Sequence, residues 1–277
     1  MKSHFAVGLI VAICLVCSYA PARAETDAVA ASTTATHPWE AAQAVLDATN
    51  ADVANGGGFS AVQAHLPDLE QALADADKAF AEAGAGTDVT YVLTDGPTDT
   101  LFSLTAAAAA SDKNSGASGK KTVAVNNPYP QISLYIGANY NEIGKFNEAL
   151  RALDRGLALY STHGIEFGAH QPSLVSERAV ALARLGRLPE ALAAYESGLK
   201  LAAIDDKGRA RMHRGRGFVL TEMNRLDEAE AAYRESLKLE PDNKIAKGEL
   251  DYIARLRAGE EKQPGAITAP GMQPKTQ

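Results

Sequence analysis

Few side chains in this sequence have the types and spacing that catalysis or metal binding needs. Beyond the first residues, the histidines are scattered at positions 37, 65, 163, 170 and 213. A zinc site at His163 and His170 is one interpretation of the loop-like stretch between them. Zinc takes three or four protein ligands, and no cluster of Asp, Glu or His at ligand spacing accompanies this pair. We therefore predict no metal site.

Motifs for nucleophilic catalysis and phosphate binding are also missing. No serine lies in a nucleophile elbow. The triplet Gly56-Gly57-Gly58 could cradle a phosphate, but it lacks a Lys or Ser/Thr at P-loop spacing, so we interpret it as a loop. The sequence therefore predicts a non-enzymatic protein with no catalytic residue and no cofactor. The alternative is an enzyme whose chemistry lies in residues 38–130, with the rest of the chain as a docking arm.

The first 24 residues have the features of a secretory signal peptide. Lys2 precedes an apolar run from Phe5 to Ala20, and Ala22-Arg23-Ala24 follows as a small-residue cleavage motif. An uncleaved anchor is the alternative, although a membrane span needs about 20 apolar residues. Both cysteines lie in this apolar run, so the mature chain would contain neither disulfides nor thiolates. We predict export, to the periplasm in a Gram-negative source and otherwise to the medium, with no membrane span in the mature chain.

Charge is unevenly divided along the chain. Residues 25–130 carry 14 acidic and 4 basic side chains, whereas residues 131–262 carry 20 of each. Because an acidic protein is repelled by nucleic acid and by anionic lipid, we expect neither as a partner. A solvated, soluble surface is the simplest explanation of the acidity.

The region before residue 131 is predicted to be rich in helix. Residues 25–37 are interpreted as a flexible leader. Between Trp39 and Phe80, apolar residues recur at helical spacing on both sides of the glycine triplet. Val89–Leu93 and Thr122–Val125 are rich in β-formers and could pair as a small β-ribbon. Between them, residues 100–110 are predicted to be helical, and residues 111–121 to be a linker.

The strongest signal is an internal repeat. Three segments align without gaps from Leu134, Ser176 and Arg214. A Glu-Ala pair recurs in each, and Gly144, Gly186 and Asn224 stand where one helix must end and the next begin. Each unit is thus a helical hairpin that cannot bury its own apolar face, so the units must stack.

This pattern resembles the tetratricopeptide repeat family, which has small residues, a Tyr, an Ala and a terminal Pro at fixed positions. The third unit shows them at Gly217, Ala229, Tyr233 and Pro241. The resemblance implies a mainly α fold, an α-solenoid that forms a right-handed superhelix. We place the three repeats at residues 131–160, 173–202 and 211–240, a capping helix at 243–257 within a unit of 131–262, and a disordered tail at 263–277.

In this family the first helix of each hairpin lines a concave face that holds a ligand. The residues that the resemblance places there are Tyr135, Ala138, Asn141, Glu177, Arg184, Arg211, Arg214 and Phe218. Two arginines beside an aromatic ring suit an acidic peptide. The competing interpretation is that the arginines form a solvated helix face balanced by nearby carboxylates.

The sequence therefore predicts an exported scaffold or adaptor that binds a protein or peptide. An assembly factor or an enzyme accessory factor of the cell envelope is the first alternative.

Overall fold

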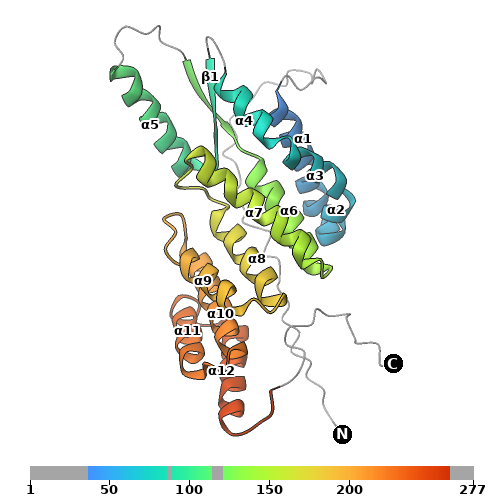
Figure 1. The fold of residues 1–277 in the computed structure, drawn as a ribbon, viewed down its shortest axis with the longest axis vertical. Helices are drawn as coiled ribbons and strands as arrows, with labels where there is room; N and C mark the ends of the chain where they lie inside the picture. Colours follow the sequence, from blue (N-terminus) through green and yellow to red (C-terminus); the bar gives the residue numbers. More distant parts are fainter. Residues whose placement is uncertain (1–36, 86–88, 114–120, 263–277) are drawn as a thin grey trace.

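The computed structural model describes residues 37–85, 89–113 and 121–262, and these are mainly helical. Figure 1 shows an elongated molecule, with the N-terminal helices beside the first helical hairpin and the later hairpins stacked along the long axis. The predicted signal peptide, most of the leader and the tail lie outside the described residues. Within the described part of the chain, no helix is long and apolar enough to cross a membrane.

The N-terminal region is a set of short helices. They are α1 (Pro38–Asp52), a π-helical turn (Val53–Gly57), α2 (Gly58–Ala64), α3 (Leu66–Ala74) and α4 (Ala76–Gly84). The glycine triplet belongs to the turn and the start of α2, where Gly56 and Gly58 have positive φ. The stretch of helical spacing between the glycine triplet and Phe80 is divided among three helices, α2, α3 and α4. One break comes before Pro67, whose missing N–H is tolerated in the first turn of a helix.

A strand–helix–strand unit follows. Strand β1 (Val89–Thr94) pairs in parallel with β2 (Lys121–Asn126), and α5 (Pro97–Lys113) connects them. The expected small ribbon therefore exists. The predicted linker at 111–121 is wrong at both ends, because α5 continues to Lys113 and β2 begins at Lys121. Its middle, residues 114–120, lies outside the described residues.

Three helical hairpins and a final helix form the rest of the fold. They are α6 (Tyr129–Glu142) with α7 (Phe146–His163), α8 (Gln171–Arg184) with α9 (Leu188–Gly198), α10 (Asp206–Glu222) with α11 (Leu226–Leu239), and α12 (Lys244–Arg257). Residues in excess of the usual period of about 34 lie in the long α7 and in the connections before α8 and α10.

The repeated residues explain the hairpins. Gly144, Gly186 and Asn224 have φ values of 76°, 74° and 59°, so each occupies the left-handed region in the turn between its two helices. The alanines of the Glu-Ala pairs, Ala191 and Ala229 among them, are fully buried where the two helices cross. Small residues at these crossings let the helices approach closely.

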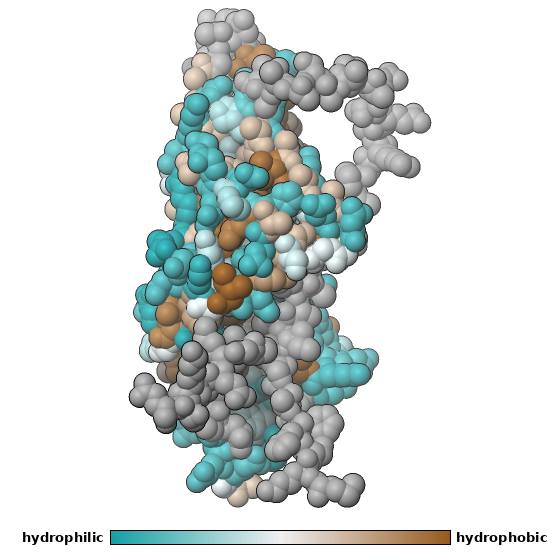
Figure 2. Space-filling model, turned by 90° about the vertical axis from the view of Figure 1, so that its right-hand side faces the viewer, coloured by the Kyte–Doolittle hydropathy of each residue, from teal (hydrophilic) through white to brown (hydrophobic). Residues whose placement is uncertain are grey.

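Two apolar cores run through the molecule. One joins α7 to the second and third hairpins and α12, and the other joins the N-terminal helices to α6 and α7. Trp39, Leu69 and Ile136 belong to the second core, so the N-terminal helices pack directly on the first hairpin. The face on which these helices lie is mainly hydrophilic, with separate hydrophobic patches (Figure 2).

Candidate functional site

The first helices of the hairpins lie next to one another, and their polar residues form one surface. We call this surface the first-helix face. It consists of Asn141 and Glu142 on α6, Glu177 and Arg184 on α8, and Arg211 and Glu222 on α10.

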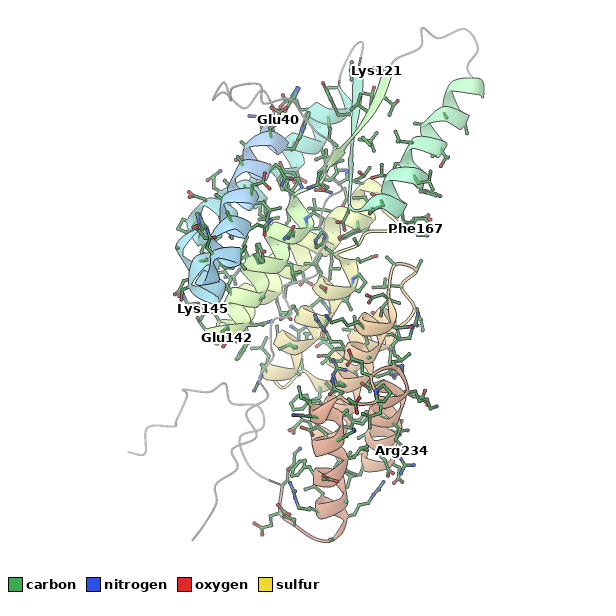
Figure 3. All side chains as sticks on the ribbon, turned by 180° about the vertical axis from the view of Figure 1, so that it is seen from behind. Glu40, Lys121, Glu142, Lys145, Phe167 and Arg234 are labelled. Carbon is green, nitrogen blue, oxygen red and sulfur yellow. The ribbon has the colours of Figure 1, made fainter. Side chains whose placement is uncertain are left out.

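Charges of alternating sign run along this face. Glu142, Arg184 and Glu222 occupy the last position of α6, α8 and α10, so the repeat itself brings them into a row. Figure 3 shows Glu142 at the end of α6, close to Lys145 in the turn. Burial lowers the pKa of Arg184, while Tyr195, Glu142 and Glu222 act in the opposite direction. The cation thus lies between two carboxylates of neighbouring repeats.

Asn141 connects the first repeat to the second. Its Nδ2 donates to the backbone oxygen of Glu177 and to Glu177 Oε2, both at 3.0 Å. Glu177 is only 8% exposed, and burial raises the pKa of its carboxyl, opposed by Asn141 and by Arg211. Glu142 adds to the increase. This carboxylate therefore depends on neighbouring donors and a cation to remain charged.

Arg211 lies near this carboxylate without a close ion pair. No salt bridge within 4.0 Å joins its guanidinium to the described residues, and the side chain is half-buried. The Tyr195 ring fills the space beside it, because Gly215 has no side chain: a Cβ there would stand 2.2 Å from the ring. Burial raises the pKa of Tyr195, and Glu177 adds to the increase.

Glu222 closes the other end of the face. Its side chain is 7% exposed, and Lys262 Nζ stands 3.0 Å from its Oε2 and donates to its backbone oxygen at 2.9 Å. Gly259, with φ of 93°, ends α12 and reverses the chain that carries Lys262.

Several of the predicted site residues do not contribute to this face. Tyr135 is 3% exposed and its hydroxyl donates to Asn50 Oδ1 at 2.5 Å, so it packs against α1. Ala138 is buried as well. Arg214 donates to Ser236 Oγ at 3.2 Å and pairs with Glu240, both belonging to its own hairpin. Phe218 is partly buried against the core.

These residues lie apart from the first-helix face because helical spacing predicts which side of a helix a residue occupies, but not which other elements cover that side. Asn141, Glu177, Arg184 and Arg211 do lie together. Glu142 and Glu222 were missed, although both align with Arg184 in the repeat, and the alternation of sign at that position was the available signal.

A second polar cluster joins the strand–helix–strand unit to the repeats. Asp95 follows β1 and is 1% exposed. It accepts hydrogen bonds from His170 Nδ1 at 2.5 Å, from the His170 backbone N–H at 3.0 Å and from the Tyr160 hydroxyl. The Ala169 N–H donates to its backbone oxygen at 2.9 Å. His163 lies elsewhere, stacked on Phe80 with ring centroids 3.6 Å apart. In the part of the chain that the structure describes, no group of three or more His, Cys, Asp or Glu residues could hold a metal ion.

The stacked helical hairpins α6–α7, α8–α9 and α10–α11 define a helical-repeat protein. Residues 172–240, from α8 to α11, match the family model of the tetratricopeptide repeat, so this part of the chain consists of tetratricopeptide repeats. A comparison with curated proteins gave no match.

Solved structures of similar fold include tetratricopeptide repeat domains. The first such domain of human RPAP3 is 24% identical, covering 47% of this chain and 94% of that chain with a TM-score of 0.40. The first repeat domain of Spaghetti (RPAP3), bound to an HSP90 peptide, is 25% identical, covering 48% and 97% with a TM-score of 0.40. The domain of Arabidopsis OM64 is 22% identical, covering 46% and 94% with a TM-score of 0.39.

Proposed function

We propose that this protein is a non-enzymatic scaffold that binds an extended segment of a partner protein along the first-helix face. The observation that carries the proposal is Arg211. It is a half-buried guanidinium without an ion pair within 4.0 Å among the described residues, beside a row of charges built by the repeat. A cation that is partly removed from water and lacks a close counter-ion is suited to a partner's carboxylate or carbonyl oxygen.

The charges on this face indicate a mixed partner and not a purely acidic one. Arg214, which the acidic-partner hypothesis required, is already held by Glu240. The face itself carries three carboxylates and two guanidiniums, at Glu142, Glu177, Glu222, Arg184 and Arg211. We therefore propose a polar peptide segment that presents an acidic group to Arg211 and donors to the carboxylates.

The test compares two arginine variants in capture experiments from the native extract. Arg211→Ala should weaken capture of a client by about 1–3 kcal/mol, the range for one charge-assisted hydrogen bond. Arg234→Ala is the matched control, because that side chain is 68% exposed on a second helix and pairs with Glu230. A client that binds wild type and both variants equally would refute the role of the first-helix face.

We also propose that the chain is exported and acts in the periplasm or outside the cell. The support is the sequence of residues 1–24, which lie outside the described residues. Mass analysis of the purified native protein should give a mature chain that starts at Glu25, and an intact Met1 would contradict the proposal. An assembly or accessory role in the envelope would use the same face with one defined client.

A further inference from the structure

Helix α5 exposes an uncharged apolar surface. Leu101 is 68%, Phe102 44% and Leu104 37% exposed. The described ranges contain four exposed large hydrophobic side chains. Three are these residues of α5, and the fourth is Ile245 on α12. No charged residue occurs from Thr100 to Ser111, in a half of the chain that is otherwise strongly acidic. Figure 1 shows α5 at the outer edge of the molecule, on the side away from α1–α4.

The two flanks of α5 face different neighbours. Thr100, Ser103 and Ala107 are partly covered and lie on the side towards the strands. Phe102 contacts Phe167 with ring centroids 5.1 Å apart, and Figure 3 shows Phe167 beside the first turns of α5. Phe167 belongs to the connection that is bonded to the end of β1 through Ala169 and Asp95. The flank of Phe102 therefore faces the β1 side.

The opposite flank faces the β2 side. At 100° per residue, Leu101, Leu104 and Ala108 lie on one stripe, and this stripe is across the helix from Phe102. All three are exposed. The most apolar part of α5 therefore overhangs the outer edge of β2.

That edge of β2 is itself unpaired. Among the described residues the sheet has two strands, so each strand has one edge without a neighbouring strand there. The Asn127 N–H donates to the Thr94 oxygen at 3.0 Å. In β2, the backbone N–H and C=O groups of the odd-numbered residues therefore point to β1. The backbone groups of Thr122 and Ala124 consequently point outwards, and no backbone partner for them occurs in the described segments. An unpaired edge is a template for another strand.

We propose that a second copy of this chain covers both features, in a dimer with a two-fold axis perpendicular to the sheet. The axis would pair β2 with β2 of the partner in antiparallel fashion and place both α5 helices on the same face. Strands are about 4.8 Å apart. Because α5 packs on both β1 and β2, the two helices would lie two strand spacings apart, at about 9.6 Å. Packed helices are about 8–10 Å apart. The same two-fold rotation would therefore pair the two β2 edges and bring the two apolar stripes of α5 into contact.

The two-fold match of strand edge and apolar stripe favours an identical copy, and the charge distribution permits one at this place. Two copies would repel each other through most of the acidic N-terminal half, which carries 14 acidic and 4 basic residues between positions 25 and 130. The uncharged stripe of α5 is a part of this half where two copies can meet without that repulsion. Ala108, the small residue of the stripe, allows the two helices a close approach at that position.

The test is the mass of the purified protein in solution over a concentration series. Sedimentation equilibrium should give about twice 29.1 kDa, less any cleaved signal peptide. Leu104→Glu should raise the dimer dissociation constant by at least about tenfold, or about 1.4 kcal/mol. Ile245→Glu is the control, because Ile245 on α12 is 40% exposed, about as much as Leu104. This change should leave the dimer intact.

Hydrogen exchange tests the strand pairing separately. The amides of Thr122 and Ala124 should be protected in the dimer and exchange rapidly in Leu104→Glu, while circular dichroism remains unchanged. A monomer at all concentrations, an open series of larger oligomers, or a dimer that survives Leu104→Glu would overturn the proposal. The first-helix face plays no part in it, so capture of a client by Leu104→Glu keeps the two proposals distinguishable.

Discussion

At the scale of single residues, the buried Asp95 carboxylate accepts hydrogen bonds from both His170 and Tyr160. Burial alone would raise the pKa of its carboxyl, but hydrogen bonds and the charge of His170, with a further bond from Tyr160, lower it below its ordinary value of 3.8. Burial lowers the pKa of His170, and Asp95 more than reverses this, so that it lies above 6.5. The pair is thus an ionic joint between β1 and the connection that precedes α8.

We predict that Asp95→Asn destabilises the protein in a pH-dependent way, by about 1–3 kcal/mol, because it weakens buried charge-assisted bonds. A lowered acid pKa contributes stability above 3.8 that is lost as pH falls. The raised pKa of His170 contributes stability that is fully present below 6.5 and is lost as pH rises through the pKa of the folded state. Thermal melts of Asp95→Asn should therefore differ most from those of wild type between pH 3.8 and pH 6.5, and less at pH 9.

Asp242→Asn, on an exposed pair with Lys247, is the control. A difference that does not vary with pH would contradict the ionic joint.

At the scale of elements, the hairpins depend on small residues where helices cross. Ala229 is fully buried in the core that extends from α7 to α12. Gly217, on the facing helix, has no room for a side chain, because a Cβ would stand 2.8 Å from the Tyr233 ring. Close approach of α10 and α11 therefore excludes larger residues at both positions.

Ala229→Leu should cost about 1–3 kcal/mol through overpacking, which lowers the melting temperature by roughly 2–4 °C for each kcal/mol in a chain of this size. Ala231→Leu, on the exposed side of the same helix, should change it little because leucine and alanine are both good helix formers. Equal melting temperatures for the two variants would show that the crossing is assigned to the wrong residues.

At the scale of the whole molecule, the N-terminal helices cover the end of the repeat array. Leu69 on α3 is fully buried and packs in the same core as Ile136 on α6. The Tyr135 hydroxyl bonds Asn50, and the Tyr140 hydroxyl bonds Glu70. A repeat array needs its terminal apolar face covered, and these helices supply that cover on one end, as α12 does on the other.

We predict that Leu69→Ala costs about 2–5 kcal/mol and that its effect spreads unevenly. In a stacked array each unit contacts its neighbours, so hydrogen exchange should rise most in α6 and α7 and least in α11. The measurement is exchange followed by mass spectrometry on peptides from each hairpin. An equal loss of protection in every helix would mean that the N-terminal helices and all repeats unfold as one unit.

The hairpins could be predicted from the amino-acid sequence alone. Gly144, Gly186 and Asn224 mark the turns and Ala229 a helix crossing, because these contacts are local or repeat with the period of the chain. The sequence also indicated the two strands, from their β-branched residues.

Only the tertiary structure decided which polar residues are available to a partner. Tyr135 and Arg214 have the spacing of site residues, yet Asn50 and Glu240 occupy them. Asp95 and His170 lie 75 positions apart and meet only because α5 returns the chain to form β2 beside β1. Contacts at such separations depend on how the elements pack against one another, and residue spacing within one helix carries no information about that packing.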